Sequence, residues 1–315
     1  WATVVFVYYG LATLLPIDKI IGKIYPIFAI ALIFMAAGIL FMIFWHHPAL
    51  PELTDGIANT HPDGLPIFPM MFISIACGAI SGFHATQSPL MARCMTNEKY
   101  GRPVFYGAMI TEGIVALIWA AAATYFFHTE EGSALFAAGS GNDNAAVIVD
   151  SITKEWLGVV GGFLAILGVI AAPITSGDTA FRSARLIVAD FLRVDQKPIL
   201  KRLMISVPLF VAGYIILHAN FSVLWRYFAW CNQTLAVFTL WALTVYLTQK
   251  RKPYVITLIP ALFMTAVCST YILIAREGLH LPQELAYWLG GAVTLFIFVL
   301  FLVWRNKYLR RNPTI

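Results

Sequence analysis

A run of polar and small residues interrupts an apolar stretch of the chain near residue 80. Before Pro89, this run contains Ser81, Gly82, His84, Thr86, Gln87 and Ser88. Polar groups inside a membrane must be satisfied by the protein or line a cavity, and interrupted helices of transporters bind substrates with such groups. We therefore predict that these six residues bind a substrate on a broken helix. An ordinary helix end with a cap and a loop is the alternative, and the spacing alone favours neither.

A second polar run begins at Pro173, which removes a helix hydrogen bond, and contains Gly177, which weakens a helix further. We expect the helix to be interrupted here. The oxygen-bearing side chains of this run are Thr175, Ser176, Asp178 and Thr179. We predict that these four residues hold the coupling ion. Hydroxyl groups that bond back into their own helix are the alternative.

The spacing of Asp178, Arg182 and Arg185 places these three residues on one helix face. A guanidinium recognises a carboxylate through paired hydrogen bonds, so Arg182 and Arg185 are predicted to gate the passage of an anionic substrate. An amphipathic helix on the cytoplasmic surface, with an Asp178–Arg182 ion pair, is the alternative.

Glu112 lies about nine residues inside another apolar stretch, between Thr111 and Gly113. A charged residue at the centre of a membrane helix costs about 2.5–3.5 kcal/mol on insertion scales and marks an ion or proton path. Burial disfavours the anionic form, which favours proton exchange. We predict that Glu112 couples transport to protons. A neutral glutamic acid that bonds to a neighbouring helix is the alternative.

The composition requires a lipid environment for these residues. An ordinary soluble domain is about 25% charged, whereas this chain of 315 residues is 12% charged and 60% hydrophobic. These values exclude a cytosolic enzyme, a nucleic-acid reader and a secreted disulfide scaffold. A membrane-crossing helix needs about 20 mostly apolar residues. Scanning on that basis predicts an all-α bundle with spans at 1–15, 24–45, 66–83, 103–127, 157–174, 203–219, 223–247, 254–275 and 285–304.

The charges of the loops test this count and predict the orientation. All of the 21 Lys and Arg residues except Lys154, Arg226 and Arg276 fall in alternate connections, and cytoplasmic loops collect Lys and Arg. We predict that the first span starts outside and that Ile315 is cytoplasmic. The long outer loops are then 46–65 and 128–156, and 177–202 is a cytoplasmic amphipathic segment. The chain begins inside an apolar run, so we expect a single transmembrane domain over 1–315 that is the C-terminal portion of a longer transporter.

Other polar and sulfur-containing residues favour simpler interpretations. The four cysteines have no CxxC spacing, which predicts neither a disulfide nor a zinc site. Three histidines at 46, 47 and 61 fit no usual ligand spacing, so no metal is expected. Asn232 and Gln233 lie inside the seventh span and predict hydrogen bonds between helices, with contact to a substrate pathway as the alternative.

Three runs of the sequence, at 80–94, 106–113 and 174–186, resemble the carbon starvation protein A (CstA) family. The resemblance covers roughly residues 66–195. It implies a bacterial inner-membrane protein of the amino acid–polyamine–organocation superfamily, with a LeuT-like inverted-repeat core and broken helices. It also implies uptake of peptides, or of pyruvate by proton symport, during nutrient limitation, and further spans before residue 1.

These observations predict a secondary active transporter that imports pyruvate, a similar small carboxylate or short peptides by proton symport. The chain has no GxxxxGK[ST] sequence, and we expect neither enzymatic activity nor a cofactor, with H⁺ preferred over Na⁺ as the driving ion. Its expected partners are the small-molecule substrate and lipid, not nucleic acid, and the oligomeric state stays open. A nutrient sensor or scaffold without transport is the main alternative. A membrane-embedded enzyme would have to use His84 and Ser88 as its base and nucleophile.

Overall fold

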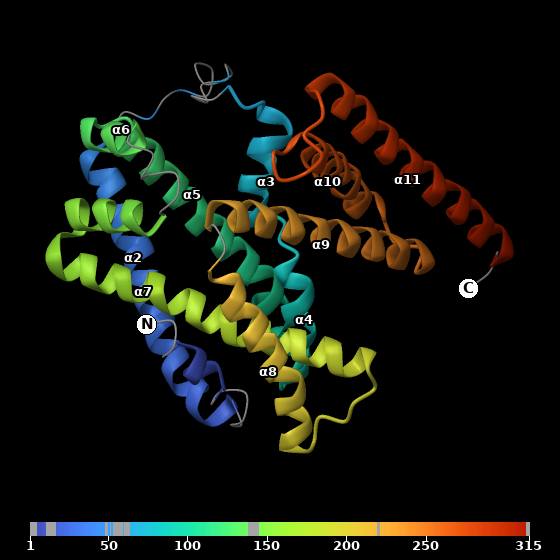
Figure 1. Cartoon of the computed structure of the whole chain (residues 1–315), viewed down its shortest axis with the longest axis horizontal. Coiled ribbons are helices and arrows are strands. Elements are labelled where there is room, and N and C mark those ends of the chain that lie inside the picture. The colour runs from blue at the N-terminus through green and yellow to red at the C-terminus, as the bar shows by residue number, and fades with distance from the viewer. Residues whose placement is uncertain are drawn as a thin grey trace. The chain divides into compact units, whose positions relative to one another are not determined.

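The computed structural model describes residues 5–10, 17–47, 50, 52, 59, 64–137, 145–218 and 221–312. All regular structure in this part of the chain is helical, which confirms the predicted all-α class (Figure 1). In chain order the elements are α2 (Ile17–His46), η2 (Ile67–Met71), α3 (Phe72–Ile75), η3 (Ala76–Gly78), α4 (Phe83–Cys94), η4 (Glu98–Tyr100), η5 (Arg102–Gly107), α5 (Ala108–Phe127), α6 (Glu130–Ala137), α7 (Ala145–Phe191), α8 (Ile199–Ile216), α9 (Phe221–Gln249), α10 (Val255–Ile274) and α11 (Gln283–Arg311).

Six of the described helical segments are long and apolar enough to cross a membrane: Pro26–His46, Glu98–Phe127, Ile199–Ile216, Val223–Gln249, Val255–Ile274 and Gln283–Arg311. They correspond to six of the predicted spans and confirm a multi-pass helical membrane protein. Of the remaining predicted spans, 1–15 lies mainly outside the described residues, 66–83 is divided into short helices, and 157–174 lies within α7. The count of nine crossings therefore stays a prediction.

The chain divides into two compact units. The first unit comprises Trp1–Glu52 and Leu90–Phe221, and the second comprises Leu53–Pro89 and Ser222–Ile315. In the first unit, α2, α5 and α7 share one hydrophobic core. Its most buried side chains are Met35 and Ile39 from α2, Ala122 and Phe126 from α5, and Ile152 from α7. In the second unit, α3, α9 and α10 contribute Ile73, Val237 and Met264 to a separate core.

The long helix α7 changes direction at Gly158, whose φ of 65° and ψ of −168° leave the helical region (Figure 1). Glycine adopts a positive φ without the steric cost that a Cβ adds. The backbone is helical at both Pro173 and Gly177, so the interruption expected there was wrong. Neighbouring groups can satisfy the carbonyl that a proline leaves free in a membrane helix, and a helical path through Pro173 is therefore possible.

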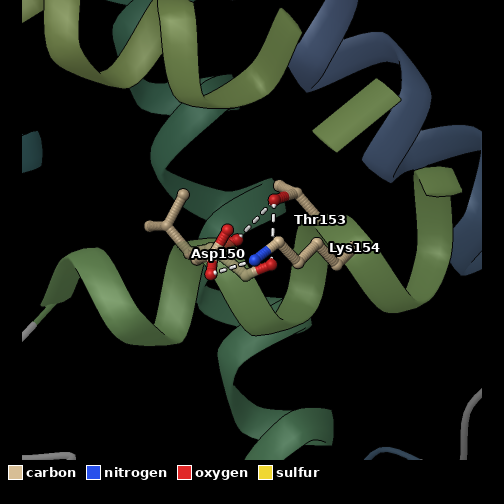
Figure 2. Close-up of polar contacts among 4 residues, drawn as sticks. Asp150, Thr153 and Lys154 are labelled. Carbon is tan, nitrogen blue, oxygen red and sulfur yellow. Dashed lines mark hydrogen bonds and ion pairs between the residues drawn. The ribbon is translucent and has the colours of Figure 1, made fainter. Parts of the chain in front are cut away.

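The predicted outer loop at 128–156 is largely helical in its described part, because α6 and the first turns of α7 lie within it. Lys154 Nζ lies 2.7 Å from Asp150 Oδ2, and the hydroxyl of Thr153 donates to the Val149 carbonyl at 2.7 Å (Figure 2). Lys154 is exposed and Asp150 is half-buried, with side chains 63% and 37% exposed. An exposed pair at this spacing contributes only about 0.3–0.5 kcal/mol, so we assign it a local role in α7.

Candidate substrate site at a helix break

The third predicted span is a discontinuous helix. Its helical turns end with η3 at Gly78, the backbone is irregular over residues 79–82, and α4 begins at Phe83 (Figure 1). The interruption of the helix agrees with the predicted broken helix, and its contact with a substrate stays a prediction. An interrupted helix leaves backbone groups without helical partners, so the surroundings of residues 79–82 decide what the break can bind.

Gly82 places the break directly against the backbone of α9. An added Cβ at Gly82 would lie 2.6 Å from the Leu235 Cβ and 2.9 Å from the Ala236 nitrogen, and closer still to the Asn232 carbonyl oxygen. Real side chains do not tolerate such contacts, so this position requires glycine. Nothing in the sequence around Gly82 identifies α9 as the partner.

The side chain of Asn232 bonds to both sides of the break. Its Oδ1 accepts the backbone N–H of Phe83 at 2.9 Å, and its Nδ2 donates to the Ser81 hydroxyl at 3.1 Å. The Ser81 hydroxyl also accepts the Phe83 N–H at 3.2 Å. Asn232 is buried, with 9% of its surface exposed, and Gln233 beside it is fully buried. The predicted hydrogen bond between helices is confirmed for Asn232.

The other predicted substrate residues lie on the first turns of α4, and all are half-buried. His84 Nδ1 lies 3.1 Å from the Ser81 carbonyl oxygen, which links the ring to the break. The Thr86 and Ser88 hydroxyls donate to the Phe83 and His84 carbonyls at 2.9 and 2.6 Å. The Ser88 hydroxyl therefore bonds back to the backbone of its own helix.

The second predicted polar run forms an ion pair inside α7. Arg182 Nη2 lies 3.5 Å from both carboxylate oxygens of Asp178, and the Asp178 side chain is only 3% exposed. The Thr179 hydroxyl donates to the Ser176 carbonyl at 2.9 Å, which is the bond back into the helix that the alternative expected. The side chain of Thr175 lies outside the described part of the structure.

Arg185 is buried one turn beyond this pair. Burial lowers the pKa of its guanidinium, and repulsion from Arg182 and Arg202 lowers the pKa further. An arginine nevertheless keeps its charge at neutral pH. The face that Asp178 shares with Arg182 and Arg185 therefore carries one buried anion and two cations, of which Arg185 is buried and Arg182 is 18% exposed.

Aromatic side chains that the sequence analysis passed over pack beside this ion pair. Tyr9, in the short helical segment 5–10, is buried and lies next to Gly177. The rings of Phe181 and Phe210 have centroids 4.9 Å apart, and the Tyr9 and Phe181 centroids are 5.4 Å apart. The two consecutive tyrosines at positions 8 and 9 were the feature of the sequence that could have indicated this packing. These aromatic contacts hold the segment 5–10 against the polar run of α7.

Glu112 lies in the second turn of α5 and is half-buried. Its neighbour Thr111 donates to the Gly107 carbonyl at 3.0 Å. The core residues of α5 begin six positions later, at Ile118. The structure thus places the Glu112 carboxyl toward the start of α5, before the tightly packed part of that helix.

A buried carboxylate that the sequence analysis missed lies in the second unit. The Glu277 side chain is 5% exposed, lies 3.2 Å from Arg226 Nε, and accepts the Tyr271 hydroxyl at 2.6 Å. Tyr227 donates to the backbone carbonyl of the same residue. These contacts tie the start of α9 to the connection between α10 and α11. Arg226 was one of the three basic residues that do not fall in the predicted cytoplasmic connections. Its unusual position could have indicated that an acidic residue pairs with it.

Comparison with known proteins places the chain in a family. The family model described as Carbon starvation protein CstA matches residues 1–160 and 123–271. The chain is 43% identical over 148 residues to a Haemophilus influenzae protein named "Uncharacterized membrane protein", which covers 42% of this chain and 40% of that protein. No solved structure matches the chain.

Two further relatives carry transporter names. The pyruvate/proton symporter BtsT of Escherichia coli is 41% identical over 78 residues, or 24% of this chain and 11% of that protein. The peptide transporter CstA of Bacillus subtilis is 26% identical over 281 residues, or 75% of this chain and 47% of that protein. The chain thus aligns with less than half of the length of each of these three relatives.

Proposed function

The chain belongs to the carbon starvation protein CstA family, and from this premise we propose that it is part of a secondary active transporter. The complete protein would import pyruvate, a similar small carboxylate or a short peptide across the bacterial inner membrane. The transporter names of the relatives support this class of function. The inner-membrane location rests on the family, and the cytoplasmic C-terminus rests on the distribution of basic residues.

The observation that carries the proposal is the helix break at residues 79–82. Its polar side chains and backbone groups are held by α9 within a membrane protein, where only interior or cavity-lining irregular backbone is stable. We assign substrate contact to Ser81, Gly82, His84, Thr86, Gln87 and Ser88. A LeuT-like core with interrupted helices is the arrangement that we propose for the complete protein, and this break is consistent with it.

We propose H⁺ as the driving ion, with Na⁺ as the alternative. Protonation of Glu112 would favour the loaded, inward-turning state through a difference in affinity between the two states. A second coupling region would comprise Thr175, Ser176, Asp178 and Thr179. Arg182 and Arg185 would gate the anionic substrate, and the ion pair between Asp178 and Arg182 would then open and close with transport.

Uptake of labelled pyruvate into proteoliposomes tests this function directly. The complete parent protein is compared with and without an imposed pH gradient, and with its Glu112→Gln variant. We expect saturable, gradient-driven uptake by the parent and its loss in the variant. Absence of pyruvate uptake in the parent would direct the same assay to short peptides. Absence of uptake with both substrate classes would contradict a transporter and favour a sensor or scaffold.

A further inference from the structure

We infer that Asn232 is the positioning residue of the substrate region. Its side-chain amide fixes the conformation of the helix break at residues 79–82 by bonding to Ser81 and to Phe83, the first residue of α4. Asn232 itself was not assigned a substrate contact above. It acts through the backbone of the break and not through the substrate. The role in transport rests on the function proposed above, whereas the fixing of the break can be measured separately.

The first step of the argument is the start of α4. The first N–H groups of a helix have no partner within that helix, and a local serine, threonine or aspartate usually accepts one of them. At α4 a local serine and another helix share this role, because the Phe83 N–H donates to Ser81 Oγ at 3.2 Å and to Asn232 Oδ1 at 2.9 Å. The bond to Asn232 is partly buried, with Asn232 9% exposed and Phe83 half-buried, so water competes less well for the same groups than at the surface.

The second step is the link from Asn232 to the predicted substrate side chains. The amide nitrogen of Asn232 donates to the Ser81 hydroxyl at 3.1 Å. The carbonyl oxygen of Ser81 in turn lies 3.1 Å from His84 Nδ1. A loss of the Asn232 amide therefore releases Ser81, and the orientation of the His84 ring changes with it.

The third step is the packing that keeps the amide in register. Gly82 lies against the Asn232 carbonyl and the Ala236 nitrogen, so α9 and the break are in backbone contact. A rotation or sliding of α9 would carry Asn232 away from Phe83. Substitution of the Asn232 side chain leaves this backbone contact in place. Mutation can therefore separate the effect of the amide from the effect of the backbone contact.

Hydrogen–deuterium exchange of the complete parent protein in nanodiscs tests the positioning role without any substrate. Asn232→Leu has a similar volume and no polar group, whereas Asn232→Asp keeps an oxygen acceptor at the same place. Thr239→Val is the matched control on α9, because the Thr239 hydroxyl donates to Leu235 within its own helix. We expect about tenfold faster exchange in peptides covering residues 82–88 for Asn232→Leu, as one lost hydrogen bond implies. The aspartate variant should restore slow exchange, and the control should match the parent.

Uptake kinetics of the same variants then test the role in transport. We expect KM to rise about tenfold in Asn232→Leu with little change in kcat, because the bond to the break is worth roughly one factor of ten. The aspartate variant should recover most of this loss, which a merely structural residue would not show. Unchanged exchange at residues 82–88 would overturn the positioning role, and faster exchange with an unchanged KM would overturn its part in transport.

Two outcomes keep this test independent of the proposed function. If the parent shows no uptake, the proposed function fails, and the exchange data alone support or overturn the fixing of the break. If Asn232→Leu does not insert into the membrane, Ser81→Ala removes the other side of the same contact. That variant should raise the exchange of residues 82–88 by a smaller factor, about threefold, and parent-like exchange would overturn the inference.

Discussion

Gly82 lies so close to Asn232 that a Cβ on this glycine would collide with the Asn232 backbone carbonyl. The contact joins a helix break to the middle of α9 through the Asn232 carbonyl oxygen and the Ala236 nitrogen, with the Leu235 Cβ beside them. Two backbones approach this closely only where one of them carries glycine. This contact fixes where the polar residues after the break can lie, and it leads to the first prediction.

Gly82→Ala should destabilise the protein by about 1–3 kcal/mol, the usual cost of overpacking, because neither backbone can move aside easily. The measurement is the thermal unfolding midpoint of the purified protein in detergent, together with substrate uptake. Gly291→Ala is the matched control, because a Cβ at Gly291 meets no other atom within 4 Å. Equal midpoints for the two variants would contradict the close contact at Gly82.

Glu277→Gln should destabilise the second unit by about 1–2 kcal/mol. The carboxylate accepts a charge-assisted bond from Arg226 and a hydroxyl from Tyr271, and such bonds contribute more than neutral ones. The expected loss of stability is small for a charge-assisted bond because the Arg226 side chain is 45% exposed and water screens its charge. Thermal unfolding at low and high salt measures the effect, and salt should narrow the difference between parent and variant.

The exposed pair of Asp150 and Lys154 provides the control for that measurement. Lys154→Gln removes an ion pair whose two side chains are 37% and 63% exposed, so we expect a loss below about 0.5 kcal/mol. If the lysine variant loses as much stability as Glu277→Gln, burial does not distinguish the two pairs. The structural role assigned to Glu277 would then be wrong.

The helix break was predictable from the sequence because its signals are local. Glycine, hydroxyl and imidazole groups replace apolar residues within a few positions of Ser81, and a membrane helix does not tolerate that change on its lipid face. The partner was not predictable, because Asn232 lies 151 positions from Ser81. Its polarity inside an apolar span predicted a bond to another helix, but only the folded chain identifies that helix.

The path of α7 shows why local signals also mislead. Pro173 and Gly177 predicted an interruption, yet the helix passes through both and bends at Gly158. A proline's effect depends on whether neighbouring groups satisfy the freed carbonyl, and a glycine bends the chain only where packing favours a positive φ. Both conditions depend on the tertiary packing around the helix, which the local sequence does not contain. The i, i+4 pairing of Asp178 and Arg182, in contrast, needs only a continuous helix, and it is the ion pair that the alternative interpretation expected.

Asp178 and Arg182 should behave as one unit in a double-mutant cycle. Asp178→Asn and Arg182→Gln should each lower stability by about 1.5–3 kcal/mol, because each removes one side of a charge-assisted contact. The double variant should lose less than the sum of the two. Thermal unfolding midpoints measure the cycle, and uptake by the double variant tests the gate. Parent-like uptake in a stable double variant would exclude the proposed gating role for Arg182.

Glu112→Gln should separate proton coupling from substrate exchange. A glutamine resembles the protonated acid in shape and charge, so the variant should still pass between loaded states. It cannot release a proton, and net uptake driven by a pH gradient should therefore be lost. The measurement is counterflow, in which labelled substrate outside exchanges for unlabelled substrate inside without a gradient. We expect the counterflow rate of the variant to stay within about twofold of the parent rate. Such a change is smaller than a tenfold change in rate, which corresponds to about 1.4 kcal/mol. Loss of both activities would make Glu112 a substrate or packing residue, and retention of both would remove it from the coupling path.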